Sequence, residues 1–118
     1  MTEHRKLLVV DDQSEICEVM QTYLAEQGYD VDYATDSPSA RRRLADDSYE
    51  LVILDIEMPA EGGLQLAKIA KEQDINVLLM SGHPMAVIDE AQKGLLFSLK
   101  AIHLDELKAA VRLIMDRR

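Results

Sequence analysis

The chain has little cysteine, little positive charge and no long apolar run, and each shortage excludes a class of protein. The single cysteine, Cys17, excludes a disulfide within the chain and fits a reducing cytosol. No apolar stretch approaches the length of a membrane span, so we expect no insertion into a membrane. Only four apolar residues follow the polar N-terminus, too few for a signal peptide. These shortages together predict a cytoplasmic protein.

Positive charge is scarce, with 22 acidic residues against 13 Lys and Arg and a formal net charge of −9. Binding to nucleic acid requires clustered Lys and Arg that neutralise phosphates. The clusters at 41–43 and 117–118 fit a solvated helix face and a helix end favoured by its dipole. We therefore expect no direct contact with nucleic acid. A length of 118 residues predicts one domain, residues 1–118.

Five short segments have the composition of strands. Four are continuous apolar runs, which is typical of strands buried on both faces of a parallel sheet. They lie at residues 7–10, 51–54, 77–80 and 95–99. The fifth, Tyr29–Tyr33, alternates aromatic or aliphatic residues with aspartates, which predicts a half-exposed strand at a sheet edge.

Helical patterns separate these strands. The first has Asp12 or Ser14 as a candidate N-cap and Gly28 as its stop. Its predicted buried face is Ile16, Val19, Met20, Tyr23 and Leu24. A short helix is expected from Pro38, then a loop over residues 58–63 because of its Pro and Gly content. Further helices are expected around Leu66–Ala70, at Pro84–Lys93 and from Leu104 to the end of the chain.

Strands that alternate with helices predict an α/β fold, a doubly wound five-stranded parallel sheet with right-handed crossovers. The last helical pattern runs to the end of the chain, so we expect a stand-alone domain. In such a sheet the ligand site lies outside the carboxyl ends of the strands. We therefore expect one crevice to collect the polar residues that follow the apolar runs, namely Asp11, Asp12, Asp55, Ser81 and Lys100.

Three carboxylates, a hydroxyl and an amine suit a divalent cation and a phosphoryl group. Taken singly, each residue also has an ordinary structural explanation: Asp11 and Asp12 as turn or cap residues, Ser81 in a plain turn, Lys100 on the surface. Taken jointly, those explanations require several coincidences in one crevice, so we favour the functional interpretation.

Four motifs, each at a different strand end, carry a resemblance to a known family. They are Leu8–Asp12, Leu54–Pro59 with Gly63 behind it, Met80–Gly82 and Phe97–Lys100. The sequence resembles a response-regulator receiver domain of two-component signalling over essentially its whole length. The resemblance implies a flavodoxin-like (βα)5 sandwich.

The resemblance also implies a role for each site residue. Asp55 would be the phosphoacceptor, since a carboxylate is a competent nucleophile toward phosphorus. Mg²⁺ would bind Asp11, Asp12, Asp55 and the backbone carbonyl of Glu57. Once Asp55 is modified, two further groups would contact phosphoryl oxygens and one aromatic side chain would turn inward as a switch. These are Lys100, Ser81 and, as the aromatic switch, Phe97.

The implied function is phosphoryl uptake from a phosphohistidine of a sensor histidine kinase or phosphotransfer protein, followed by signalling through contact with a downstream protein. Such a domain is no enzyme beyond its own phosphorylation and dephosphorylation.

Two departures, Ala101 in place of the usual proline and a short segment from Ser81 to Lys100, favour an alternative. That alternative is a pseudo-receiver that binds proteins without being phosphorylated. An aspartyl phosphatase ranks last, because Glu57 stands where such enzymes carry a second aspartate.

Overall fold

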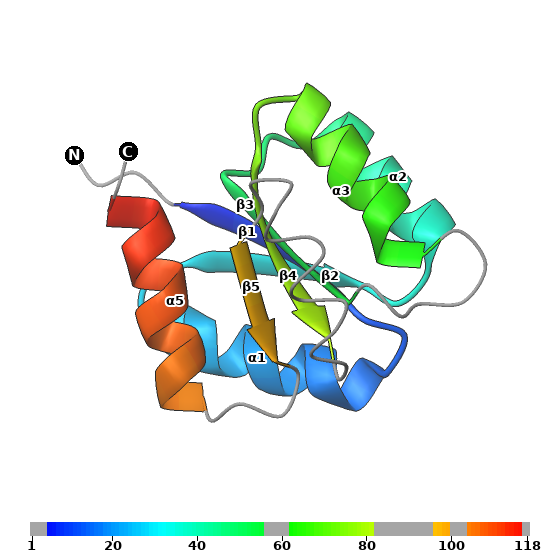
Figure 1. Ribbon diagram of the computed structural model, residues 1–118. Helices are drawn as coiled ribbons and strands as arrows, with labels where there is room; N and C mark the ends of the chain where they lie inside the picture. The colour runs from blue at the N-terminus through cyan, green and yellow to red at the C-terminus, as the bar shows by residue number, and fades with distance from the viewer. Residues whose placement is uncertain (1–4, 56–61, 82–95, 100–103, 117–118) are drawn as a thin grey trace.

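The computed structural model (Figure 1) describes residues 5–55, 62–81, 96–99 and 104–116. Its strands are β1 (Lys6–Val10), β2 (Asp30–Ala34), β3 (Leu51–Asp55), β4 (Asn76–Ser81) and β5 (Leu96–Leu99). Its helices are α1 (Ser14–Glu26), α2 (Ser37–Asp46), α3 (Gly62–Glu72) and α5 (Leu104–Asp116). Each of these elements falls where the sequence pattern predicts one. The helix expected at Pro84–Lys93 lies outside the described residues.

The strands form one parallel sheet in the order β2-β1-β3-β4-β5. β2 is therefore an edge strand, as its alternating pattern predicted. From β1 the chain goes to β2 on one side and then crosses back to β3 on the other. The winding direction reverses between β1 and β3. In open α/β sheets, ligands bind at the carboxyl ends of the strands beside this reversal.

Helices cover both faces of the sheet (Figure 1), and its apolar side chains divide between two cores, one on each face. Successive residues of a strand point to opposite faces. Leu8 and Val10 of β1 belong to the core under α2 and α3, while Leu7 and Val9 pack with α1 and α5. All residues of β3 are buried. Strands covered on both faces need continuous apolar runs, so this arrangement confirms the predicted doubly wound α/β fold.

α1 differs from the prediction in how it begins and in which face it buries. Its N-cap is Gln13, without a side-chain cap hydrogen bond, so the expectation that Asp12 or Ser14 caps the helix is wrong. Val19, assigned to the buried face, is 52% exposed. Met20 and Leu24 are buried as predicted, but the helix is turned so that the stripe facing the sheet includes a residue outside the predicted set. That stripe consists of Cys17, Met20 and Leu24.

Two other boundaries follow the expected local chemistry. α1 ends before Gly28, whose φ of +99° is the left-handed conformation that commonly stops a helix. α2 begins at the N-cap Asp36, whose carboxylate accepts a hydrogen bond from the Ser39 N–H at 2.8 Å, with Pro38 in the first turn. α2 is short, at 10 residues, as predicted.

α3 begins earlier than its sequence indicates. Gly62 and Gly63, expected in a loop, form the first turn of the helix, so that part of the loop prediction is wrong. Tertiary packing outweighs the low helix propensity of glycine. The stabilising contacts come from one buried stripe, Leu66, Ala67 and Ala70. No helix in the described part of the chain has both the length and the apolar character needed to cross a membrane.

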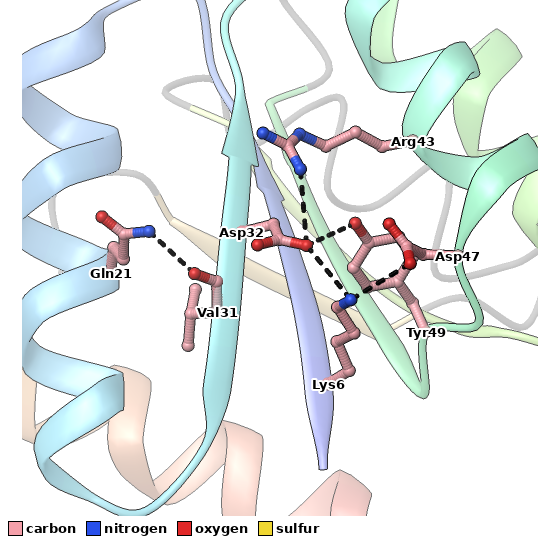
Figure 2. A network of polar contacts seen from close by, with 7 residues as sticks. All are labelled: Lys6, Gln21, Val31, Asp32, Arg43, Asp47 and Tyr49. Carbon is pink, nitrogen blue, oxygen red and sulfur yellow. Dashed lines mark hydrogen bonds and ion pairs between the residues drawn. The ribbon is translucent and has the colours of Figure 1, made fainter. Parts of the chain in front are cut away.

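A network of polar side chains ties the edge strand β2 to its neighbours on the α2 side (Figure 2). Asp32 accepts a hydrogen bond from the Tyr49 hydroxyl at 2.7 Å. The same carboxylate oxygen lies 3.7 Å from Lys6 Nζ and 3.4 Å from an Arg43 guanidinium nitrogen. Lys6 also pairs with Asp47 at 3.2 Å, and this bond raises the pKa of Lys6. The network therefore joins β1, β2, α2 and the segment that leads into β3.

On its α1 side, β2 receives a different contact (Figure 2). The Gln21 side-chain amide donates to the Val31 carbonyl at 2.7 Å. Backbone groups of Asp30 and Ala34 face β1, since the Asp30 N–H donates to the Arg5 carbonyl at 2.9 Å and the Ala34 carbonyl accepts from Asp11. The intervening Val31 backbone therefore faces away from β1. The Gln21 amide therefore donates a hydrogen bond to a carbonyl on the open edge of the sheet.

Candidate functional site

Three aspartates meet between β1 and β3 because of the register of these strands. Val10 is paired with Leu54, so the residues that follow them, Asp11 and Asp55, reach the same level on adjacent strands. Asp12 comes next in the turn into α1. Carboxylate oxygens of the three aspartates lie within 4.8 Å of one another. The structure thus brings together the three carboxylates that the sequence predicted for one crevice.

Burial makes the negative charge of this cluster costly in free energy. Asp11 and Asp55 are each only 2% exposed, whereas Asp12 is exposed. Ionised carboxylates are costly to withdraw from water unless they are paired or bind a cation, and crowding them together adds repulsion. Carboxylate oxygens are the hard ligands that Mg²⁺ prefers, and Mg²⁺ keeps several of its waters. A cluster with two buried carboxylates and one exposed carboxylate therefore fits Mg²⁺.

Asp11 is held in place by three hydrogen bonds that the sequence pattern does not reveal. Its N–H donates to the Ala34 carbonyl at 3.2 Å. Its carboxylate accepts from the Gln13 N–H at 2.9 Å. Its carbonyl accepts from the Cys17 thiol at 3.4 Å. The end of β1 is thereby tied both to the end of β2 and to the first turn of α1.

Cys17 lies deeper than the sequence suggested. The predicted buried face of α1 did not include Cys17, but its exposed fraction is 0%. Its helical spacing with Met20 and Leu24 is the signal that identifies this position as central. Burial, assisted by the charge of Asp11, raises the pKa of the thiol to about 11. The thiol is therefore protonated at neutral pH and able to donate.

The structure describes only some of the other predicted site residues. Ser81 is the last residue of β4, one position beyond Met80, which is paired with Asp55. Phe97 lies on β5 and is paired with Leu79. The structure therefore puts the Ser81 backbone at the same end of the sheet as the aspartates. The remaining predicted site residues, Glu57 and Lys100, lie outside the described residues.

Comparison with known proteins identifies the family. The family model described as the response regulator receiver domain matches residues 7–112. Transcriptional regulatory protein DltR of Streptococcus agalactiae serotype III is 32% identical over 113 residues, which cover 92% of this chain and 50% of DltR. The chain spans 34% to 50% of the length of such curated relatives.

Solved structures agree with this family. The receiver domain of the Francisella response regulator 1452 has a TM-score of 0.85 at 28% identity, covering 97% of this chain and 98% of that one. Response regulator TrrA from Thermotoga maritima was solved in complex with Mg(2+)-BeF. It has a TM-score of 0.83 at 33% identity, with coverage of 93% and 98%. Because the family model spans most of the chain and the fold agrees, the chain belongs to the response regulator receiver domains, the signalling domains of two-component systems.

Proposed function

We propose that this domain takes up a phosphoryl group on Asp55 and signals through phosphorylation-dependent contact with another protein. The observation that carries this proposal is the position of Asp55. It ends the central strand β3, is 2% exposed, and has carboxylate oxygens within 4.8 Å of those of Asp11 and Asp12. A nucleophilic carboxylate beside a divalent-cation site is the arrangement that phosphoryl transfer requires.

The transfer needs little from the protein beyond positioning and neutralisation of charge. A carboxylate oxygen of Asp55 attacks the phosphorus of a phosphohistidine. The new oxygen–phosphorus bond forms as the nitrogen–phosphorus bond breaks, and the histidine leaves with the electron pair and takes up a proton. The product is an acyl phosphate on Asp55. Hydrolysis by water returns Asp55 to its carboxylate and releases inorganic phosphate.

Asp11, Asp12 and Asp55 would hold Mg²⁺, together with the backbone carbonyl of Glu57. When held there, Mg²⁺ would supply positive charge that offsets the negative charge of the phosphoryl oxygens. The donor set fits, since it consists of hard carboxylate oxygens of which two belong to buried side chains. The relative TrrA, crystallised with Mg(2+)-BeF, supports the same ligand chemistry here.

Three further residues complete the proposed site. The Lys100 ammonium would contact a phosphoryl oxygen as a point charge. The Ser81 hydroxyl would donate to another phosphoryl oxygen after Asp55 is modified. Phe97, on the neighbouring strand β5, would turn inward as Ser81 moves, and so change the outer surface of the domain. These roles extend the resemblance to positions that match the motifs of the family.

The proposed phosphodonor is a sensor histidine kinase or a histidine phosphotransfer protein in the cytoplasm. The output partner is a protein. DltR, a transcriptional regulator, is about twice as long as the matched segment, and this chain carries a net charge of −9. We therefore propose that any effect on DNA passes through another protein or domain and not through contacts of residues 1–118. The stand-alone arrangement stays a prediction.

A pseudo-receiver that binds partners without phosphorylation is the second candidate. The observation in its favour is Ala101, which stands where the family usually has proline, next to Lys100. The three clustered aspartates favour the phosphorylated receiver instead. The two candidates differ in one measurable property, phosphoryl uptake.

The test is incubation with acetyl phosphate and Mg²⁺, followed by intact mass. We expect wild-type protein to gain the mass of one phosphoryl group and Asp55→Asn to gain none. Asp46→Asn is the matched control, since it removes an exposed carboxylate at the end of α2. Uptake by Asp55→Asn would contradict the assignment of Asp55. No uptake by wild-type protein, from acetyl phosphate or from a phosphorylated histidine phosphotransfer protein, would favour the pseudo-receiver.

A further inference from the structure

Cys17 on α1 contacts the backbone of one member of the acidic cluster, Asp11. Its side chain is fully buried, and its sulfur is 3.4 Å from the carbonyl oxygen of Asp11 and 3.9 Å from that of Ala34. The thiol thus sits between the ends of β1 and β2. The same Ala34 carbonyl accepts the N–H of Asp11 at 3.2 Å. The ends of the paired strands β1 and β2 therefore both lie close to the Cys17 sulfur.

These contacts fix the peptide groups on both sides of the Asp11 side chain. The N–H of Asp11 is bound to Ala34 and its carbonyl is bound by the thiol. The carboxylate is then directed by the Gln13 N–H at 2.9 Å. If the Asp11 carbonyl rotated away from Cys17, the Asp12 N–H would turn with it, because both belong to one planar peptide group. That turn would move both the carboxylate of Asp12 and the Gln13 N–H that orients Asp11.

We propose that Cys17 is a positioning residue for the cation site: by donating to the Asp11 carbonyl, its thiol sets the separation of the carboxylates of Asp11, Asp12 and Asp55. This inference rests on the proposed function, because it takes these carboxylates to be the Mg²⁺ ligands. Groups that orient metal ligands without touching the metal commonly change metal affinity when they are removed. Cys17 is such a group, acting through the backbone.

The competing explanation is that Cys17 only fills space in the core. Replacement by alanine and by serine separates the two roles, because serine keeps a donor and alanine does not. If Cys17 only fills space, serine is the worse replacement for the stability of the fold, since its hydroxyl adds a polar group to an apolar site. A positioning role makes serine the better replacement for Mg²⁺ binding. The two roles thus predict opposite orders for the same pair of variants.

The experiment is a Mg²⁺ titration followed by amide chemical shifts, on wild-type protein, Cys17→Ala, Cys17→Ser and Met20→Ala. Met20 shares the buried face of α1 but has no proton to donate, so it controls for lost packing. We expect the dissociation constant to rise about ten-fold in Cys17→Ala. We expect it to stay close to the wild-type value in Cys17→Ser and Met20→Ala. Unchanged affinity in Cys17→Ala, or equal losses in Cys17→Ala and Met20→Ala, would overturn the inference.

A second measurement separates failure of this inference from failure of the proposed function. Wild-type protein that binds no Mg²⁺ would overturn the proposed function. Hydrogen exchange at the Asp11 and Gln13 amides, measured without metal, still decides whether Cys17 positions this turn. We expect faster exchange at both amides in Cys17→Ala and wild-type rates in Cys17→Ser. Wild-type rates in Cys17→Ala would overturn the positioning role, whatever the metal affinity.

Discussion

Asp12 is the exposed member of the carboxylate cluster, and it can be removed without opening the core. We predict that Asp12→Ala abolishes phosphorylation by acetyl phosphate, because one cation ligand is lost. The same change leaves the melting temperature equal or slightly higher, because repulsion among the carboxylates falls. Intact mass and thermal denaturation measure the two effects. Equal phosphorylation rates of wild-type protein in Mg²⁺ and in EDTA would refute the cation requirement.

The hydroxyl of Ser37 is buried and has no hydrogen-bond partner in the described part of the chain. An unsatisfied polar group costs free energy that an apolar replacement of similar size does not. We predict that Ser37→Ala raises the free energy of unfolding by about 1 kcal/mol, measured with urea. Ser48→Ala, at an exposed serine, is the control and changes little. A lower stability of Ser37→Ala would mean that the hydroxyl is satisfied in solution.

The raised pKa of Cys17 predicts a loss of stability in alkali. In the unfolded chain the thiol loses its proton near its ordinary pKa of 9.0, whereas the native protein holds that proton up to about 11. Above the lower value the native state binds more protons, so rising pH favours unfolding. The contribution of the thiol to the free energy of unfolding is fully present below its unfolded-state pKa. It is lost as the pH rises through its native-state pKa.

Urea denaturation at about pH 8 and about pH 10 tests this linkage. We expect wild-type protein to lose more free energy of unfolding between the two conditions than Cys17→Ala does. Burial also raises the pKa of the Tyr49 hydroxyl. Because Tyr49 is retained in both proteins, the difference between them isolates the thiol. Equal losses would mean that the thiol titrates alike in the native and unfolded states.

At the scale of elements, the contact between Tyr49 and Asp32 links the segment before β3 to the edge strand. We predict that Tyr49→Phe lowers the free energy of unfolding by about 1–2 kcal/mol, because a hydrogen bond to a carboxylate is lost. The loss stays in this range because Lys6 and Arg43 still pair with Asp32. Tyr29→Phe is the control. An equal effect of both changes would show that the hydrogen bond contributes nothing specific.

Elements whose residues are covered on both faces could be predicted from sequence alone. A strand such as Leu51–Asp55 has to be apolar throughout, and the aspartate that ends it is then visible as the first polar residue. The convergence of Asp11, Asp12 and Asp55 followed from parallel topology. Positions that depend on how one element turns against another could not be predicted in this way.

The failures show which information is missing from a local pattern. Val19 fits a helical stripe as well as Cys17 does, and only the rotation of α1 on the sheet decides between them. Gly62 and Gly63 look like a loop, and only the packing of the helix behind them makes them helical. The bond from Cys17 to Asp11 joins a thiol to a backbone carbonyl, which no pattern of side-chain types encodes.

For the whole molecule, we predict a small conformational response to phosphorylation. Phe97 has no hydroxyl that needs a polar partner, so burial of its ring is favoured even without phosphate. The resemblance implies a segment from Ser81 to Lys100 that is short for the family, which would leave less chain to rearrange. The resting domain is therefore expected to resemble its active form, with a smaller change in partner affinity than in a typical receiver.

Amide chemical shifts of the free and the beryllofluoride-bound domain measure this response, because beryllofluoride stands in for the phosphoryl group on Asp55. We expect changes confined to the neighbourhood of the three aspartates. Asp55→Asn, which offers no carboxylate to beryllofluoride, is the control. Large changes across residues 84–104 would show a fully operative switch.

The contact from Gln21 to the Val31 carbonyl bears on how these molecules behave at high concentration. An edge strand is a template on which a strand of another molecule can pair and begin a continuous sheet. Here one carbonyl of that template is already occupied by a side chain of the same molecule. Asp30 and Asp32 on the same strand place like charges opposite any identical strand that approaches. β2 therefore discourages pairing with a strand of another molecule at this edge of the sheet.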